Sequence, residues 1–384
     1  MKTVRLGKTD LEVSRIGIGG IPIQRPPEDE AIRVVQRALD LGVTFIDTAR
    51  RYGTSEERIG KAVAGRRDQV VIATKIFDRD KGDKATTLEQ LEQSLKSLNT
   101  DYIDLWQFHG INAFEEYERV LGGTMEAAQE ALQTGKIRHI GISSHSMEVA
   151  LKAVSSGLFE TIQFPFNFVN NDPADELVPL AREHDVGFIA MKPLAGGQLK
   201  DANLAIKYLL QFDNVVPDPG IQKVEEIEEI VGIVNGSWEL VSQERQKMED
   251  IRAALGRRFC QWCNYCLPCP QEVDIPCLMN ARAIENYGEG FVSWVAKAVE
   301  SGRNCIQCGE CEEKCPFHLP IREMIVEHIE FFESVRPLDG SESRQSIFGG
   351  KEVQKQSGRR GRLSKEISEC NTVNSGNWIG GDRL

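Results

Sequence analysis

Most of the ten cysteines of this 384-residue chain lie in two dense runs whose spacing suits metal ligation. One run has the form C-x2-C-x2-C-x3-C-P, a spacing that lets thiolates surround an iron–sulfur cubane. The other run is nearly a copy, with one residue fewer before its Cys-Pro. The runs consist of Cys260, Cys263, Cys266 and Cys269, and of Cys305, Cys308, Cys311 and Cys315. Together they predict a module with two 4Fe-4S clusters.

The two runs are expected to share their ligands. In two-cluster ferredoxins the fourth cysteine of each run binds the other cluster. Cys315 is therefore predicted to complete the cluster of the first run, and Cys269 that of the second. Cys277 is the alternative ligand, although a buried small hydrophobe is the favoured interpretation, and Cys370 is predicted to be free. Zinc is the competing metal, because it also binds four thiolates.

A second group of reactive side chains lies upstream, where predicted strands end. Asp47, Tyr52, Lys75 and His109 offer a carboxylate, a phenol, an amine and an imidazole. A phenol is a poor acid at neutral pH unless a neighbouring cation favours the phenolate. Lys75 can supply that cation, Asp47 can keep Lys75 charged, and His109 can position a carbonyl oxygen. This combination indicates proton donation to a developing alkoxide.

These side chains need a scaffold that brings successive strand ends to one rim. Short β-branched segments alternate with amphipathic helical patterns over residues 1–237, which favours a (β/α)8 TIM barrel with its reactive groups at the C-terminal strand ends. A hairpin over residues 4–14 is expected to precede the first barrel strand and to cover the bottom. The expected strands are Ile16–Gly19, Thr44–Thr48, Val70–Thr74, Tyr102–Gln107, His139–Ser143, Thr161–Phe166, Gly187–Met191 and Val215–Pro217.

The remainder of the chain divides into three parts. A polar linker helix is predicted over residues 238–256, with Trp238–Leu255 as its core. Residues 257–335 form the small, mostly helical, dicluster ferredoxin-like domain. Residues 336–384 lose their periodicity and become rich in Gly, Ser and Arg, so they are predicted to be a disordered tail. The predicted fold class is thus an α/β barrel followed by a cluster-binding module.

Composition limits the class of protein and its partners. The hydrophobic content of 41% and the charged content of 27% are those of a globular protein. A net charge of −12 argues against nucleic-acid binding, which needs Lys and Arg to neutralise phosphates. No apolar run is long enough to span a bilayer, and no signal-peptide pattern opens the chain, so a cytoplasmic location is expected.

The barrel segment resembles the aldo-keto reductase family. The resemblance rests on sequences around the four reactive residues and on one later segment, and it covers about residues 1–235. It implies reduction of an aldehyde or ketone by a bound nicotinamide cofactor, with Tyr52 as general acid. The whole chain is similar to a branch in which such a barrel is fused to a C-terminal 4Fe-4S module. The matching stretches are Gly42–Ala49, Tyr52-Gly53, Ser55-Glu56, Ile72–Lys75, Asp104–His109 and Gly135–Ser143.

The resemblance also implies residues that hold NADPH or NADH. Ser143 and Gln163 match contacts to the nicotinamide carboxamide, whereas Ser144 replaces the usual Asn. Met191 lies where the family places an aromatic ring against the nicotinamide. Four glutamates soon after Gln222-Lys223 argue against a bound 2′-phosphate, unless they face away. The remaining cofactor candidates are Lys192, Leu194, Gly196, Gln222 and Lys223.

The sequence therefore predicts an NAD(P)H-linked oxidoreductase acting on a small carbonyl substrate. The clusters are expected to relay electrons from a redox partner protein, to sense redox state, or to hold the C-terminal module in place. Relay is favoured, because a purely structural role rarely needs two clusters. The alternative is a ferredoxin-type electron-transfer or regulatory protein whose barrel only binds a ligand or a partner.

Overall fold

The computed structural model describes residues 1–76, 82–255, 258, 260, 266–286, 289–315 and 317–335. Three parts of the predictions above lie outside these residues, namely the ligand Cys263, the free Cys370 and the tail over residues 336–384.

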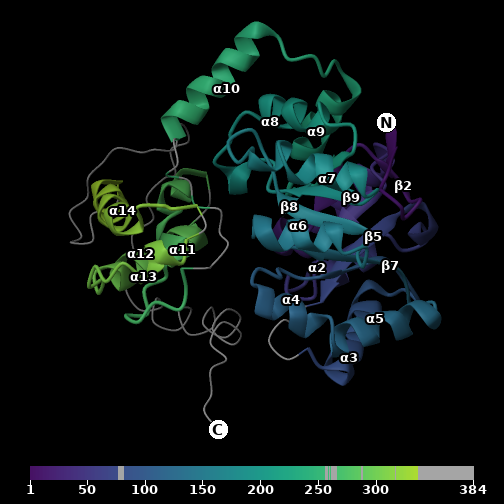
Figure 1. The fold of residues 1–384 in the computed structure, drawn as a ribbon. Helices are drawn as coiled ribbons and strands as arrows, with labels where there is room; N and C mark the ends of the chain where they lie inside the picture. Colours follow the sequence, from purple (N-terminus) through teal and green to yellow (C-terminus); the bar gives the residue numbers. More distant parts are fainter. Residues whose placement is uncertain are drawn as a thin grey trace, which may run out of the picture. The chain divides into compact units, whose positions relative to one another are not determined.

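The described chain opens into an eight-stranded parallel sheet whose strands follow one another in chain order. A parallel bridge between Gly19 and Gly220 joins the first strand to the segment after the last one, so the sheet closes on itself. This is the predicted (β/α)8 barrel (Figure 1). Its strands are β3 (Gly17–Gly19), β4 (Phe45–Asp47), β5 (Val71–Ile76), β6 (Ile103–Phe108), β7 (Ile137–Ser143), β8 (Thr161–Pro165), β9 (Gly187–Met191) and β10 (Val215–Pro217).

Strand limits agree with expectation to within about two residues, with one consequence for the site. Lys75 was expected to follow its strand, but it lies inside β5, where it pairs with Gln107 of β6. The backbone of Lys75 is therefore held by the sheet, which fixes the direction of its long side chain.

Helices surround the strands, and their apolar faces account for their positions. In α1 the buried residues Ala31, Val34, Val35 and Ala38 recur at helical spacing and face the sheet. The barrel helices are α1 (Glu28–Asp40), α2 (Ser55–Ala62), α3 (Lys84–Leu98), α4 (Phe114–Val120), α5 (Gly123–Gln133), α6 (Met147–Ser155), α7 (Leu177–Glu183), α8 (Ala202–Leu210) and α9 (Val224–Asn235).

The expected N-terminal hairpin is present as β1 (Thr3–Arg5) and β2 (Glu12–Ser14), which pair antiparallel. Leu6 and Val13 are buried in one apolar cluster with Phe45, Leu105 and Ile189 from the barrel strands. The hairpin thus covers strand residues at the end of the barrel opposite the strand C-termini.

Beyond the barrel the described chain is helical. The linker helix α10 (Ser242–Leu255) begins four residues later than predicted, because the Trp238 indole donates a hydrogen bond to Val234 O (2.7 Å) and so belongs to the end of α9. No helix within the described ranges is long and apolar enough to cross a membrane. The helices of the C-terminal part are α11 (Ile275–Leu278), α12 (Glu289–Gly302), α13 (Glu310–Glu313) and α14 (Ile321–Val335).

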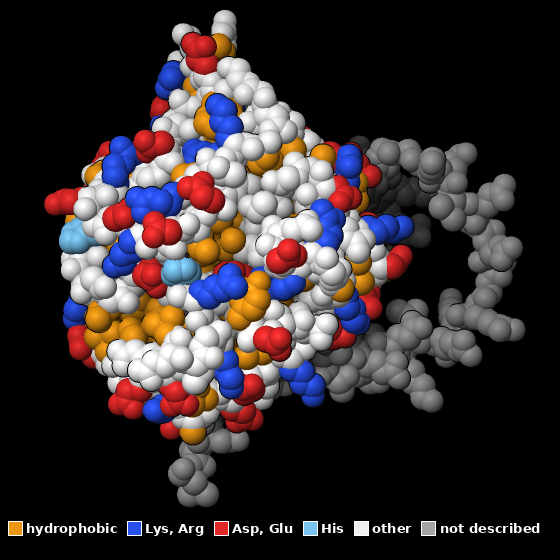
Figure 2. Space-filling view, turned by 90° about the vertical axis from the view of Figure 1, so that its right-hand side faces the viewer, with side chains coloured by type: hydrophobic (Ala, Val, Ile, Leu, Met, Phe, Trp, Pro, Cys, Tyr) orange, Lys and Arg blue, Asp and Glu red, His pale blue; other side chains and the backbone are white. Residues whose placement is uncertain are grey.

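The molecular face drawn in Figure 2 carries a mixture of side chains. Lys and Arg alternate with Asp and Glu, and apolar side chains lie between them. On this face the two signs of charge are interspersed.

A buried arginine joins the first and last strands of the barrel. Arg15 lies two residues before β3, and its guanidinium donates to the carbonyl oxygens of Val215 (2.8 Å), Phe212 (2.9 Å) and Asp213 (3.0 Å). Toward the other end of the same seam, Gly19 N donates to Pro219 O (2.8 Å). A Cβ atom on Gly19 would lie 2.6 Å from Asp218 O, so the seam requires glycine there.

We expect Arg15→Met to destabilise the barrel by about 3 kcal/mol, because buried carbonyls lose a charged donor that no water replaces. Urea unfolding followed by tryptophan fluorescence measures the effect. Arg15→Lys is the matched control, and it should recover only part of the loss because an ammonium cannot span three carbonyls. Equal stability of wild type and Arg15→Met would contradict this account of the seam.

Candidate active site and cysteine-lined pocket

The barrel mouth contains a buried ion pair from neighbouring strands. Lys75 Nζ of β5 donates to Asp47 Oδ2 at the end of β4 (2.5 Å) and to the carbonyl oxygen of Thr48 (2.8 Å). The two side chains are almost wholly buried, with 1% and 3% of their residues' surface exposed. Gln107 of β6 donates to the other carboxylate oxygen of Asp47 (3.1 Å). The ammonium group is therefore fixed in position before any ligand arrives.

Tyr52 and His109 stand against this pair. Lys75 Nζ lies 5.1 Å from the centroid of the Tyr52 ring. The rings of Tyr52 and His109 meet edge to face, with centroids 5.6 Å apart and an interplanar angle of 82°. The structure thus brings all four residues singled out in the sequence to one place, and it leaves Tyr52 and His109 partly exposed.

The loop that carries Tyr52 is held from both sides. Ser55 Oγ at the start of α2 lies 2.9 Å from Thr48 Oγ1 and donates to Gly20 O (2.8 Å). Glu56 is buried, accepts a hydrogen bond from Thr74 Oγ1 (2.7 Å) and forms an ion pair with Arg50. These contacts explain why Ser55-Glu56 accompanies the reactive tyrosine in the sequence.

Burial and charge shift the pKa values at this site. Burial raises the pKa of Tyr52, while the charge of Lys75 and a hydrogen bond from it act in the opposite direction. Burial is the largest single effect on Lys75 and lowers its pKa, but the acidic groups around it, Asp47 first, together outweigh burial and the pKa is raised. Lys75 is therefore a stable cation at neutral pH, and Tyr52 carries its proton there.

A second carboxyl that the sequence analysis did not single out lies in the same interior. Asp218 directly follows β10 and is 4% exposed. Its Oδ2 accepts a hydrogen bond from Gln163 Nε2 of β8 (2.6 Å). Burial, and then the charge of Asp47, raise its pKa well above the usual range. The available signal was an acidic residue between two prolines at a strand end.

The predicted cofactor residues Ser143 and Ser144 lie at the end of β7 and just beyond it. Ser143 Oγ accepts a hydrogen bond from Gly110 N (2.8 Å) and so fixes the turn after His109. Ser144 is fully buried, and its hydroxyl lies 3.5 Å from Asn112 Oδ1. Asn112 also accepts from His145 N (2.8 Å), and it places an amide beside the position where the family's usual Asn is missing.

The loop after β9 holds the next candidates. Met191 ends the strand, and Lys192 has a positive φ of 58° while its Nζ lies 3.3 Å from His145 Nε2. Leu194 precedes a short turn in which Gly196 and Gly197 have φ of 65° and 93°. Glycine tolerates these left-handed conformations, and the turn is closed by a hydrogen bond from Gly197 N to Leu194 O (2.9 Å).

Gln222 and Lys223 lie directly before α9. Their backbone N–H groups donate to Glu226 Oε2, at 2.8 and 3.2 Å. Of the neighbouring acidic residues, Glu228 pairs with Arg37 of α1 (2.7 Å). Glu226 lies at the N-terminus of the helix, where its carboxylate accepts these two hydrogen bonds. It is thus the glutamate that the backbone of Gln222 and Lys223 engages.

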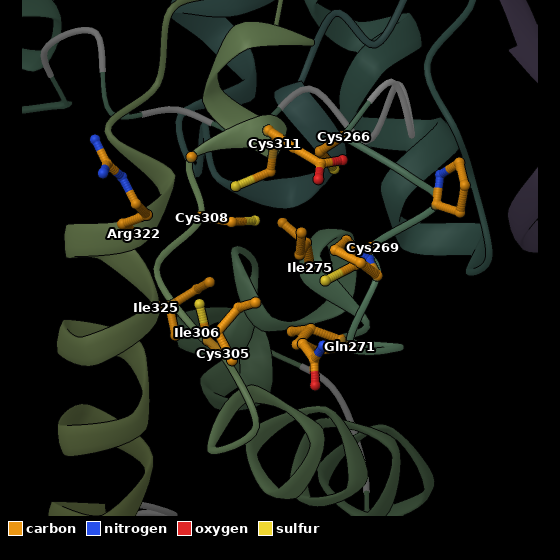
Figure 3. A pocket seen from close by; sticks show the side chains of 15 residues that line it. Cys266, Cys269, Gln271, Ile275, Cys305, Ile306, Cys308, Cys311, Arg322 and Ile325 are labelled. Carbon is orange, nitrogen blue, oxygen red and sulfur yellow. The ribbon is translucent and has the colours of Figure 1, made fainter.

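The C-terminal part of the described chain contains a pocket lined by cysteines of both runs (Figure 3). Gln307 and Gly309, with φ of 60° and 89°, turn the second run around it. Gln307 Nε2 also lies 3.8 Å from Cys305 Sγ. Among the described residues, no three His, Cys, Asp or Glu side chains are grouped closely enough to hold a metal ion. The cysteines that line the pocket are Cys266, Cys269, Cys305, Cys308 and Cys311.

The remaining cysteine candidates lie nearby in the chain but do not line this pocket. Cys260 and Cys315 are buried in the apolar cluster of this region. Cys277 is fully buried in α11, and burial raises the pKa of its thiol. A buried small hydrophobe, the favoured interpretation of Cys277, agrees with this environment.

Comparison with known proteins identifies the class to which this barrel belongs. Residues 15–204 match the description "Aldo/keto reductase family". The chain is 34% identical over 240 residues to the aldo-keto reductase YhdN of Bacillus subtilis, covering 58% of this chain and 71% of that protein. It is also 34% identical over 215 residues to the B. subtilis "Uncharacterized oxidoreductase YqkF", covering 53% of this chain and 68% of the relative.

Solved structures show the same barrel. The holo form of aldo-keto reductase AKR11C1 from Bacillus halodurans matches with a TM-score of 0.57 and 29% identity, over 65% of this chain and 96% of that one. An aldo/keto reductase from Klebsiella pneumoniae in complex with NADP and acetate matches with a TM-score of 0.56 and 25% identity, over 65% and 95% of the two chains. The chain belongs to the aldo/keto reductase family, and it is an aldo-keto-reductase-like oxidoreductase.

Lys75→Met is expected to lower the free energy of unfolding by about 3–5 kcal/mol at neutral pH, because it leaves the Asp47 carboxylate buried without its cation. Asp47 then has a folded-state pKa above its unfolded value, so the loss should grow as pH rises from about 4. Urea denaturation at pH 5 and pH 8 tests both points.

The double variant Asp47→Asn/Lys75→Met is the control, since it removes the unpaired charge together with its partner. It should recover much of the stability and show little dependence on pH. If the double variant is no more stable than Lys75→Met at pH 8, the buried charge is not the cause of the loss.

Proposed function

We propose that this protein reduces an aldehyde or ketone with a nicotinamide cofactor, and that Tyr52 is the general acid. The observation that carries the proposal is the position of Lys75, which contacts Asp47 on one side and the Tyr52 ring on the other. A buried cation beside a phenol is the arrangement that eases loss of the phenolic proton.

The residues of this chain divide the chemical work as follows. Tyr52 donates its proton to the substrate oxygen as that oxygen becomes an alkoxide, and Lys75 stabilises the phenolate that remains. Asp47 keeps Lys75 charged, and Gln107 holds Asp47 in place. His109, against the Tyr52 ring, positions the carbonyl oxygen. The nicotinamide supplies the hydride when it is bound.

The residues present fit a nicotinamide dinucleotide. Ser143 and Gln163 lie at neighbouring positions of β7 and β8, and Gln163 Oε1 is buried without a hydrogen-bond partner in the described part of the chain. Ser144, Met191, Lys192, Leu194 and Gly196 continue the same rim in our proposal. The Klebsiella structure with bound NADP supports a cofactor of this class.

NADPH and NADH are both compatible with this proposal, and the choice depends on Gln222 and Lys223. The backbone N–H groups of these residues are already engaged by the Glu226 carboxylate. A 2′-phosphate would have to displace that carboxylate or bind beside it, at an electrostatic cost. The position of the Glu226 carboxylate thus favours NADH, whereas the NADP bound in related structures favours NADPH.

Tyr52→Phe should lower kcat by roughly 10²- to 10⁴-fold, because the variant keeps the ring but loses the proton donor. Oxidation of NAD(P)H with a panel of aldehydes measures turnover, and quenching of protein fluorescence measures cofactor affinity, which should change little. Tyr117→Phe is the matched control, since its buried hydroxyl has no hydrogen-bond partner within the described residues. Unchanged turnover in Tyr52→Phe would refute the assignment.

We further propose that the cysteine runs bind two 4Fe-4S clusters. The proposal is supported by the spacing of the runs and by a pocket that both runs line. Cys269 of the first run lines that pocket with Cys305, Cys308 and Cys311 of the second, and these four are the ligand set expected for one cluster. Cys266, which belongs to the other expected set, lines the same pocket. Ile275, Ile306 and Ile325 supply apolar surface around the thiols.

The other ligand set is Cys260, Cys263, Cys266 and Cys315, of which Cys263 lies outside the described residues. The clusters would carry single electrons, and we favour relay from a redox partner over redox sensing or a structural role. A cytoplasmic, reducing setting belongs to the same proposal, because it keeps the thiols available for ligation.

After anaerobic purification the wild-type protein should contain about eight iron atoms and as much sulfide per chain, the content of two cubanes. Cys311→Ser should lose about half of the iron and change the EPR spectrum of the reduced protein. Cys277→Ala is the control and should retain the full content, because its side chain is fully buried away from the pocket lining. A wild-type protein that holds zinc in place of iron would overturn the cluster proposal.

A further inference from the structure

Two acceptors in the barrel interior are buried without hydrogen-bond partners in the described structure. They are Gln163 Oε1 and Asp218 Oδ1, on side chains that are joined to each other through Gln163 Nε2 and Asp218 Oδ2 (2.6 Å). Both residues are nearly inaccessible, with 1% and 4% of their surface exposed. An unpaired polar atom in such a place is costly, so it points to a ligand that completes it.

Charge counting shows which form Asp218 takes. The titratable groups that act on it are Asp47 of β4, Tyr52 of the loop between β4 and α2, and Lys75 of β5. The single cation, Lys75, is committed to Asp47, and no ion pair reaches Asp218 among the described residues. A second buried carboxylate would be uncompensated, so Asp218 keeps a proton.

The orientation of the Gln163 amide follows from its neighbours. Its side chain faces Asp218 and also hydrogen-bonds to Asp47, the carboxylate that forms the ion pair with Lys75. A carboxylate can only accept hydrogen bonds, so the NH2 group of Gln163 must face the two carboxyl groups. The Gln163 carbonyl oxygen is thereby directed to a different neighbour.

We propose that Asp218 is a further ligand-binding residue of this site, and that its neutral carboxyl group and the Gln163 carbonyl oxygen together bind a primary carboxamide. Asp218 Oδ1–H offers a donor to the carboxamide oxygen, and Gln163 Oε1 accepts from the carboxamide NH2. No covalent step is involved. The inference rests on the proposed function, in which the carboxamide is that of the nicotinamide ring.

Variants at position 218 test the proposal by direct binding of NADH and NADPH, measured by fluorescence on the complete protein. Asp218→Asn keeps a donor and an acceptor without a charge, so it should bind within about threefold of wild type. Asp218→Leu has a similar size but neither group, and it should bind roughly tenfold or more weakly, as expected when a buried polar contact is lost.

The pH dependence separates this role from a purely structural one. Asp218 loses its donor when it ionises, so wild-type affinity should fall relative to that of Asp218→Asn as the pH is raised through the pKa of the Asp218 carboxyl. The free energy of unfolding should change in the same direction. The pKa of Asp218 is raised in the folded protein, so the stability that its protonated carboxyl contributes is lost as the pH rises through that pKa. Equal pH profiles for the two proteins overturn the proposal.

A modified cofactor keeps the test decisive if Asp218→Leu does not fold. The analogue with an acetyl group in place of the carboxamide lacks the NH2 donor, and wild type should bind it roughly tenfold more weakly than NADH. Gln163→Met should remove most of that difference. If wild type binds NADH and the acetyl analogue equally well, the carboxamide contact is refuted and the proposed function stands. If wild type binds neither NADH nor NADPH, the proposed function is refuted as well.

Discussion

The barrel mouth is organised by one buried cation. Among the described residues, Lys75 is the only Lys or Arg that lies with Asp47, Tyr52 and Asp218, so three acidic groups depend on a single positive charge. Desolvation of an ion pair is costly, and the pair persists only where hydrogen bonds satisfy the remaining polar atoms. Thr48 O and Gln107 Nε2 supply these bonds. The site is therefore stable in one arrangement of charges, with protons on Tyr52 and Asp218.

Strand register makes this arrangement possible. Residues paired across neighbouring parallel strands point to the same face of the sheet, and Lys75 of β5 is paired with Gln107 of β6. Gln107 is in turn paired with Gly141 of β7, whose Cβ would lie 2.1 Å from Thr161 Oγ1 and 3.1 Å from Gln107 Cγ. The absent side chain leaves space for the Gln107 amide that holds Asp47. A glycine of the barrel interior thus supports the charge arrangement two strands away.

The barrel and the four residues Asp47, Tyr52, Lys75 and His109 could be predicted from the sequence, because short segments of the chain carry the signals that identify them. The strands around Asp47 and Lys75 are short β-branched runs between amphipathic helices, and such patterns locate strand ends to within a few residues. Asp218 was not predicted as a site residue, because a carboxylate beside prolines is also typical of an exposed turn. Only closure of the barrel, through Gly19 N and Pro219 O, turns that segment inward. Long-range pairing of this kind leaves no periodic signal near the residue itself.

The barrel and the cysteine runs suit reactions that transfer different numbers of electrons. A nicotinamide transfers two electrons as hydride, whereas an iron–sulfur cluster transfers one at a time. Around Lys75 and Asp47 the interior is filled by Gln107, Gln163 and Asp218, which hold protons and hydrogen bonds and carry no group that accepts a single electron. The carbonyl reduction that we propose for this site therefore needs no electron from a cluster. If the cysteine runs bind clusters as proposed, their electrons serve a partner or a signal, unless a further one-electron carrier joins the two.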